Sequence, residues 1–258
     1  MSFLTMARIV KREKICGEIF HLVLETERPL ESLPGQFLRL SFPGILDPFL
    51  PRPFLIFQER GPIVEIVFNV RGKFTKMLSQ MALSESLEVH GPLGKPFYLP
   101  PQESYLFVGG GTGAAFFPRY IQELKGRRHL FLLGARDSSA NWFAPFFPSG
   151  NTLLLTEDGS SGLRGTILDH LQDTVNDFCP SLILASGPLP LLRGITTLLA
   201  EEGAPVWLVL EEIMGCGIGV CLSCAITLNQ EEKRRKVCLC REGLVWPAKE
   251  VILPETGN

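Results

Sequence analysis

The 258-residue sequence has no apolar run approaching the roughly 20 residues that a membrane-spanning helix needs. Its first residues lack a basic leader ahead of a long apolar core, so we expect a protein that is neither exported nor held in a membrane. Charge of one sign is not in excess either, because the formal net charge is −2 at pH 7. Such a balance gives no electrostatic reason to bind nucleic acid. With 45% hydrophobic and 20% charged residues, the chain can bury a substantial core.

The sequence also lacks the residue patterns that are typical of catalysis by side chains. The histidines are scattered, and none has a spacing typical of a metal site or a catalytic triad: His21, His90, His129 and His170. No nucleophile stands with a matching base, so we predict no catalytic side chain and expect bound cofactors to supply the chemistry. The basic run at residues 233–236 is short and follows two glutamates, which indicates a solvated hairpin tip.

Four of the seven cysteines form the most specific pattern in the chain: Cys216, Cys221, Cys224 and Cys240. The spacing C-x4-C-x2-C followed by a distant cysteine is the plant-type arrangement of thiolate ligands around a [2Fe–2S] cluster. Intervening glycines let the backbone fold tightly around the inorganic core. Structural zinc is the main alternative, but zinc sites usually have two C-x2-C pairs and this sequence has one.

The spacing alone does not decide whether Cys238 or Cys240 is the fourth ligand. A disulfide framework is not expected in a chain with a large core and no secretory signal. We expect Cys16 and Cys179, which lie far from the pattern in apolar surroundings, to be buried thiols.

The pattern of residues 1–100 predicts β structure. Short apolar runs at 19–24, 36–40 and 63–68 are separated by Pro–Gly and Gly–Pro turn signals. Several short strands at this spacing predict a closed antiparallel β-barrel. One helical interval is expected at 73–82.

From residue 101 onward, strands alternate with helices, which predicts a parallel α/β sheet. The expected strands are 105–108, 130–134, 151–156 and 181–185, and the expected helices are 114–125, 166–171 and 189–202. The chain from about residue 209 is rich in glycine and cysteine, and a hairpin arm is expected at 237–246. The predicted domains are therefore 1–100, 101–208 and a cluster-binding segment at 209–258.

Three turns follow predicted strands of the α/β sheet and would share its carboxyl edge. Successive glycines let the phosphates of a dinucleotide approach the backbone, and a helix N-terminus favours negative charge. The first turn is not the G-x-G-x-x-G fingerprint, so a glycine turn shaped by packing is the alternative for it. Together the three turns predict a nucleotide-binding cleft. Its candidate residues are Gly109, Gly110, Gly111, Thr112, Gly113, Asp158, Gly187 and Pro188.

Two motifs in the first hundred residues could bind phosphate. Arg52 precedes Pro53 at the start of a predicted strand, and its planar guanidinium matches phosphate oxygens, although a surface arginine is the better interpretation of this motif alone. The motif Gly-Lys-Phe-Thr at 72–75 opens the predicted helix, where free N–H groups and the Thr75 hydroxyl could hold a pyrophosphate.

The ordered motifs together resemble the electron-transfer subunit of the NAD-dependent, two-subunit dihydroorotate dehydrogenase, within the ferredoxin reductase superfamily. The resemblance covers nearly the whole chain. Besides the motifs already described, it rests on Pro-Gly-Gln-Phe at 34–37 and Gly-Pro-Leu-Gly at 91–94. Residues 240–246 are similar to the family's Cys-x-x-Gly-Pro-Val-Phe, which implies Cys240 as the fourth ligand.

The resemblance implies FAD on the barrel, NAD on the α/β domain and a [2Fe–2S] cluster in the C-terminal segment. Flavin contacts would fall on Arg52, Pro53, Phe54, Leu55, Val67, Phe68, Asn69, Phe74 and Thr75. A separate FMN-containing subunit would oxidise dihydroorotate in pyrimidine biosynthesis, and its electrons would pass singly through the cluster to FAD and then as hydride to NAD. The chain would be an oxidoreductase subunit without activity on dihydroorotate alone. The resemblance also implies a heterotetramer of two plus two subunits, and reduced thiols indicate the cytoplasm.

The sequence departs from the family pattern at several places. Leu55 stands where the family has Ser or Thr, Asn69 where Arg is usual, and Phe74 at the second glycine of Gly-Lys-Gly-Thr; the proline expected soon after the glycine loop is absent from 114–117. A lost hydrogen bond costs on the order of 1 kcal/mol, so three losses would weaken FAD binding about a hundredfold.

Two alternatives therefore stay open: a reductase subunit of the same fold serving a ferredoxin, sulfide, sulfite or hydrogenase partner, and a degenerate flavin-free redox or binding module. Cys216 favours the dihydroorotate branch, because related ferredoxin–NADP reductase subunits usually have Asp there.

Overall fold

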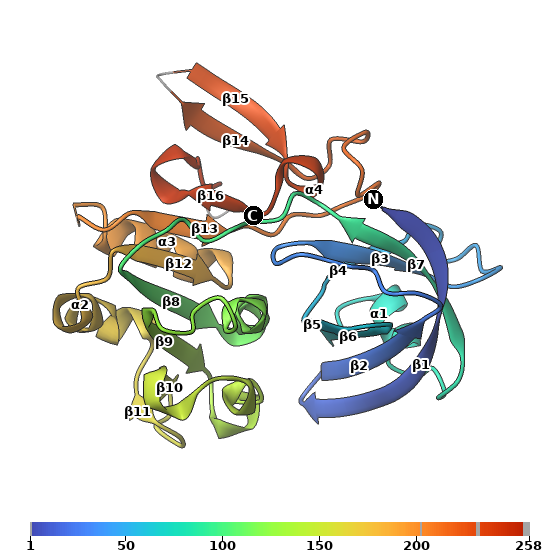
Figure 1. The fold of residues 1–258 in the computed structure, drawn as a ribbon, viewed down its shortest axis with the longest axis horizontal. Helices are drawn as coiled ribbons and strands as arrows, with labels where there is room; N and C mark the ends of the chain where they lie inside the picture. Colours follow the sequence, from blue (N-terminus) through green and yellow to red (C-terminus); the bar gives the residue numbers. More distant parts are fainter. Residues whose placement is uncertain (1, 202, 231–232, 255–258) are drawn as a thin grey trace. The chain divides into compact units, whose positions relative to one another are not determined.

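The computed structural model describes residues 2–201, 203–230 and 233–254. The chain forms two compact units (Figure 1), and its C-terminal part contributes to both. Of the described residues, unit 1 comprises 2–98, 211–225 and 238–244, and unit 2 comprises 99–201, 203–210, 226–230, 233–237 and 245–254.

Unit 1 is built on a curled antiparallel sheet with the strand order β4-β3-β7-β1-β2-β6-β5. Its strands are β1 Phe3–Cys16, β2 Ile19–Thr26, β3 Phe37–Ser41, β4 Arg52–Leu55, β5 Gln58–Arg60, β6 Ile63–Asn69 and β7 Ser86–Leu93. The apolar runs take this form because alternate side chains of a strand face one side. In β6, Val64, Ile66 and Phe68 enter the core while the residues between them are half-buried.

Helix α1 (Lys73–Leu78) lies between β6 and β7 in the chain and adds Phe74 and Leu78 to the core of unit 1. It is shorter than the predicted interval 73–82. The Ser79 hydroxyl donates to the Lys76 carbonyl, and the Gln80 N–H donates to the Met77 carbonyl at 2.9 Å. These contacts across three residues tighten the last turn and end the helix.

Unit 2 contains a mainly parallel sheet with the order β11-β10-β9-β8-β12-β13-β16. Its strands are β8 Ser104–Gly110, β9 Arg128–Ala135, β10 Thr152–Thr156, β11 Leu163–Arg164, β12 Leu182–Ser186, β13 Val206–Val209 and the antiparallel β16 Val245–Pro247. Every residue of β8 and β12 is buried, as expected for central strands of a sheet covered on both faces.

The remaining elements are α2 Ile167–Phe178, α3 Leu189–Leu198, α4 Leu239–Glu242, the paired strands β14 Ala225–Gln230 and β15 Lys233–Cys238, and the 3-10 helices η1 Gly111–Phe116, η2 Pro118–Tyr120, η3 Ser138–Ala140, η4 Ala144–Phe146, η5 Ser149–Asn151 and η6 Ala248–Glu250. Helix α2 extends seven residues past the predicted 166–171, behind a capping box of Thr166 and Asp169. Helix α3 ends before residue 202, which lies outside the described residues. No helix in the described ranges is long and apolar enough to cross a membrane.

Two predicted elements are wrong. The expected helix at 114–125 is a series of 3-10 turns, with the Phe117 N–H donating to the Ala114 carbonyl at 3.2 Å. Pro118 has no N–H to continue an α-helix, which explains the shorter turns. The expected hairpin arm at 237–246 is also absent: β15 ends at Cys238, α4 follows, and Gly243 at φ +105° turns the chain into β16.

The basic residues at 233–236 lie on β15 and are exposed, as expected, whereas residues 231–232 lie outside the described part of the chain.

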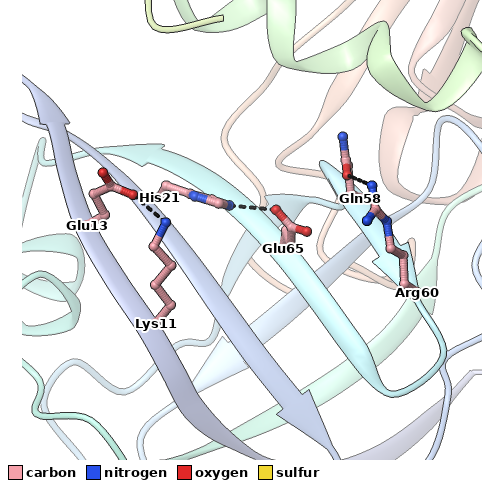
Figure 2. A network of polar contacts seen from close by, with 6 residues as sticks. All are labelled: Lys11, Glu13, His21, Gln58, Arg60 and Glu65. Atoms are coloured by element: carbon pink, nitrogen blue, oxygen red, sulfur yellow. Dashed lines mark hydrogen bonds and ion pairs between the residues drawn. The ribbon is translucent and has the colours of Figure 1, made fainter. Parts of the chain in front are cut away.

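Unit 1 also holds a polar network on strands β1, β2, β5 and β6 (Figure 2). His21 Nε2 lies 2.8 Å from Glu65 Oε2, and their side chains are 11% and 17% exposed. Lys11 and Glu13 form a neighbouring ion pair at 2.6 Å, with both side chains more than half exposed. The His21–Glu65 contact is therefore the one shielded from solvent.

We expect Glu65 to make the stability of the fold pH-dependent. The hydrogen bond with His21 holds the pKa of Glu65 below its ordinary value, against the raising effect of burial. A carboxylate of this kind stabilises the fold above its unfolded pKa, and the contribution is lost as pH falls through the lower folded pKa. Glu65→Gln should lower the free energy of unfolding at neutral pH by about 1 kcal/mol or less, and by nothing once the carboxylate is protonated.

Denaturant unfolding at a series of pH values from neutral to acid measures this difference. Glu13→Gln is the matched control, since its carboxylate is exposed and its ion pair is screened at high salt. A constant gap between the wild-type protein and Glu65→Gln at every pH would contradict the assignment.

Candidate functional site

The predicted cluster ligands lie in two short segments of unit 1. Cys216, Cys221 and Cys224 belong to the irregular segment 211–224 after β13, which we call the cysteine loop, and Cys240 lies in α4. Cys224 and Cys240 are buried, with 1% and 2% exposure, Cys216 is half-buried and Cys221 is exposed. The cysteine loop therefore has two thiols nearer the surface, and its third thiol and that of α4 lie in the interior.

The backbone of the cysteine loop wraps around the Cys216 sulfur. Its Sγ accepts N–H groups from Ile218 at 3.4 Å, Val220 at 3.2 Å and Cys221 at 3.3 Å. Gly217 and Gly219 permit this path with φ values of +65° and +84°. Burial raises the pKa of Cys216, but the three backbone donors outweigh burial and lower it. A thiolate is the form that binds a metal.

The four sulfurs divide into two pairs. The Cys216 N–H points at Cys221 Sγ at 3.3 Å, and the Ser223 hydroxyl, 3.1 Å from the same sulfur, lowers the pKa of Cys221 to about 6. Cys224 and Cys240 are both buried, and burial, together with the neighbouring Cys224 thiol, raises the pKa of Cys240 to about 12. Each iron of a [2Fe–2S] cluster takes two thiolates, so two such pairs fit the group. No three Cys, His, Asp or Glu side chains of the described residues form a site for a single metal ion.

Cys238 and Cys240 differ in their surroundings. Both lie near the thiol of Cys224, but only Cys240 is buried and also lies near the backbone of Gly219 in the cysteine loop, which lowers its pKa against the effect of burial. Cys240 therefore lies close both to Cys224 and to the part of the cysteine loop between Cys216 and Cys221.

The expectation that Cys179 is a buried thiol is wrong. Cys179 is exposed because it follows the end of α2 in a left-handed conformation with φ +47°, where its Sγ donates to the Asn176 carbonyl at 3.1 Å. Cys16 is half-buried at the end of β1.

The structure brings two of the predicted nucleotide-binding turns together in unit 2. A Cβ atom at Gly113 would lie 2.6 Å from the Cα of Gly187, and one at Gly110 would lie 3.4 Å from Pro188 and 2.5 Å from Leu191. The turn after β8 and the turn after β12 therefore touch, and at Gly113 the backbone of Gly187 leaves no room for a side chain. Gly109 is the second-last residue of β8, and Gly111, at φ +56°, and Thr112 begin η1.

The third turn, after β10, is organised by Asp158. Its Oδ1 accepts the N–H of Ser160 at 2.9 Å and the hydroxyl at 2.7 Å, which lowers the pKa of Asp158. Ser160 Oγ in turn accepts the N–H of Ser138, in the turn after β9, at 2.8 Å. Ser138 was not predicted as a site residue, and its position directly after a parallel strand is the signal that could have found it.

The predicted flavin-binding residues of unit 1 divide between two faces. Phe54, Phe68 and Phe74 are buried in the core, with the rings of Phe74 and Phe42 centred 4.6 Å apart. The half-buried members are Arg52, Pro53, Leu55, Val67, Asn69 and Thr75.

The start of α1 lies close to the Arg52 cation. Its guanidinium carbon is 5.9 Å from the Phe74 ring centre, and its Nη1 donates to the Leu50 carbonyl at 2.6 Å. Thr75 Oγ1 accepts N–H groups from Arg71 at 3.0 Å and Gly72 at 3.2 Å. A fixed cation beside the first turn of a helix suits an anionic group such as a pyrophosphate.

Comparisons with known proteins agree with this organisation. A family model described as the iron-sulfur cluster binding domain of dihydroorotate dehydrogenase B matches residues 211–252, which include the whole cysteine motif. A dihydroorotate dehydrogenase B (NAD(+)) electron transfer subunit from Shouchella clausii is 34% identical over 260 residues, covering 95% of this chain and 96% of the relative. Its counterpart from Desulforamulus reducens is 33% identical over 228 residues, covering 86% and 87%. The chain belongs to this family of electron transfer subunits.

Solved structures agree on the fold of this family member. The structure of an NADH-dependent reduced ferredoxin-NADP oxidoreductase matches with a TM-score of 0.82 and 25% identity, covering 96% of this chain and 90% of that one. A ferredoxin reductase in carbazole 1,9a-dioxygenase matches with a TM-score of 0.68 and 20% identity, covering 80% and 69%. The predicted family and the ferredoxin-reductase-like fold are confirmed, and the chain is an oxidoreductase subunit. The alternative partners are not favoured.

For this electron transfer subunit we expect Cys240→Ser to lose the cluster and Cys238→Ser to keep it. Both thiols lie near Cys224, but Cys240 is buried and also lies near Gly219 of the cysteine loop, whereas Cys238 is half-buried. Iron and acid-labile sulfide, assayed after anaerobic purification together with the visible spectrum, measure the loss. Cys238→Ser is the matched control, and a cluster retained only in Cys240→Ser would contradict the assignment.

Proposed function

We propose that this chain carries electrons from a dihydroorotate-oxidising, FMN-containing subunit through a [2Fe–2S] cluster and FAD to NAD. The observation that carries the proposal is the meeting of two thiol pairs within the segment that matches the iron-sulfur family model. The parts of that segment that contain the cysteines, residues 211–225 and 238–244, belong to the same compact unit as the strands that have the flavin-binding motifs.

The proposed cluster ligands are Cys216, Cys221, Cys224 and Cys240. A bound [2Fe–2S] cluster supplies one-electron transfer. The residues of the cysteine loop hold the ligand sulfurs, and their backbone N–H groups stabilise the negative charge on Cys216.

The proposed flavin residues are Arg52, Pro53, Phe54, Leu55, Val67, Phe68, Asn69, Phe74 and Thr75. Bound FAD supplies the exchange between one-electron and two-electron transfer. In this proposal Arg52 and the first turn of α1 bind the pyrophosphate, and the strand residues line the ring. Because the Phe74 side chain enters the core, its replacement of a glycine adds no bulk on the solvent side of α1. We therefore expect only Leu55 and Asn69 to weaken FAD binding, by about thirtyfold for two lost hydrogen bonds.

The proposed NAD residues are Gly109, Gly110, Gly111, Thr112, Gly113, Asp158, Gly187 and Pro188. The contact of Gly113 with Gly187 supports the proposal, because two side-chain-free turns let phosphates approach both backbones. Asp158 keeps the third turn ordered through Ser160.

The proposed partner is the FMN-containing catalytic subunit, in a cytoplasmic heterotetramer of two plus two. Large apolar side chains of the cysteine loop are exposed, with Val220 at 74%. Exposed apolar groups concentrated in one segment are typical of a protein-binding surface. We therefore place the catalytic subunit against Ile213, Ile218, Val220 and Leu222.

An anaerobic NADH titration followed by visible absorbance tests the proposed path. We expect bleaching of both the flavin and the cluster bands, since NADH reduces the flavin and the flavin reduces the cluster. A cluster spectrum without flavin bands, unchanged by NADH, would contradict the path and favour a flavin-free redox module.

We also expect Leu55→Ser to strengthen FAD binding about fivefold, because a hydroxyl at this half-buried position adds one hydrogen bond worth about 1 kcal/mol. Titration of flavin-depleted protein with FAD, followed by flavin fluorescence, measures the dissociation constant. Leu83→Ser, at a leucine of unit 1 that is 60% exposed, is the control. Equal affinity of Leu55→Ser and the wild-type protein would remove Leu55 from the proposed site.

A further inference from the structure

Arg39 is the one charged residue of strand β3, whose neighbouring residues Phe37, Leu38 and Leu40 are buried. Backbone pairing places it opposite His90 of β7 and Pro53 of β4. An arginine in the middle of such a strand needs a specific reason, because burying a cation costs free energy unless an opposite charge offsets it.

The Arg39 side chain lies directly against the cysteine loop. A Cβ atom at Gly217 would stand 2.5 Å from Arg39 Cδ and 3.1 Å from Nε. Gly217 also has φ +65°, a conformation that favours glycine. The loop thus closes over the stem of Arg39 at the residue that follows Cys216, and any larger side chain at 217 would displace one or the other.

The guanidinium group of Arg39 lacks an ordinary partner. Its Nε is buried without a hydrogen bond, and none of the ion pairs formed by the described residues includes Arg39. Burial lowers the pKa of Arg39, and the nearby thiols of Cys216, Cys240 and Cys221 oppose that change. An arginine stays protonated in proteins, so its positive charge persists beside these sulfurs.

The charge of the cluster that the proposed function assigns here would supply the missing partner. Two ferric ions, two sulfides and four thiolates together carry two negative charges, and adding one electron makes three. A fixed cation therefore stabilises the reduced form more than the oxidised form. The nearby His90 adds no competing negative charge, since a histidine is neutral or cationic.

We propose that Arg39 is the counter-cation of the [2Fe–2S] cluster: it raises the reduction potential of the cluster and, through its contact with Gly217, positions the cysteine loop. The proposal rests on the proposed function, because it requires a cluster on these cysteines. Arg39 acts here as a positioning and tuning residue and touches no substrate.

Redox titration of the cluster in the purified protein, monitored by electron paramagnetic resonance, tests the proposal. In Arg39→Gln the equilibrium constant for one-electron reduction should fall at least about tenfold, which corresponds to a potential lower by about 59 mV. Arg39→Lys keeps the charge and should retain most of the wild-type potential. Arg60→Gln is the control, since it removes an exposed arginine from β5, at the other end of the strand order from β4 and β3, and should change nothing.

The iron and sulfide content of the wild-type protein distinguishes a failure of the proposed function from a failure of the proposed role of Arg39. A wild-type protein without cluster contradicts the proposed function and removes the role of Arg39 with it. An intact cluster whose potential is the same in Arg39→Gln, or is lowered equally by Gln and Lys, overturns the role of Arg39 alone. If only Arg39→Gln loses the cluster while Arg39→Lys keeps it at the wild-type potential, the proposal stands. Loss in both variants overturns the electrostatic role and leaves Arg39 as a packing residue under Gly217.

Discussion

The convergence of the thiols depends on the pairing of β14 with β15. Strand β14 begins at Ala225, directly after Cys224, and β15 ends at Cys238, two residues before Cys240. Consecutive strands paired with each other return the chain to its starting point, so cysteines far apart in sequence become neighbours. The Leu239 N–H completes the closure by donating to the Cys224 carbonyl at 3.1 Å. The rest of the cluster site, including the turn of α4, is arranged around this junction.

Charge is the second constraint on unit 1. The cysteine loop brings several thiols together, and unit 1 places backbone N–H groups against sulfur and the half-buried Arg39, whose Nε has no hydrogen-bond partner, beside the loop. Gly217 makes both possible, because it takes the left-handed turn and leaves room for the Arg39 stem. A second shielded polar side chain has a partner on β2 and β6, where His21 forms a hydrogen bond with Glu65.

The meaning of a departure from a motif depends on where the side chain points. Phe74 replaces a glycine of the family pattern, yet its ring packs on Phe42 in the core. Leu55 and Asn69 lie half-buried on the other face of their strands, where a changed side chain can alter binding directly. Gly113 shows the opposite case, since the close backbone of Gly187 leaves no space for any side chain.

The sequence by itself determined the two sheets, the cysteine pattern and the family, because alternation of apolar residues and ligand spacing are local properties of the chain. It failed at 114–125 and 237–246, where a proline and a glycine redirect segments with an ordinary composition, and at Cys179, whose exposure follows from the end of a helix. Only the tertiary structure decided that Arg39 lies under Gly217, that Ser138 joins Asp158 through Ser160, and that Cys240 is held by both Cys224 and Gly219. These contacts join residues distant in sequence, and no local preference encodes which distant segments meet.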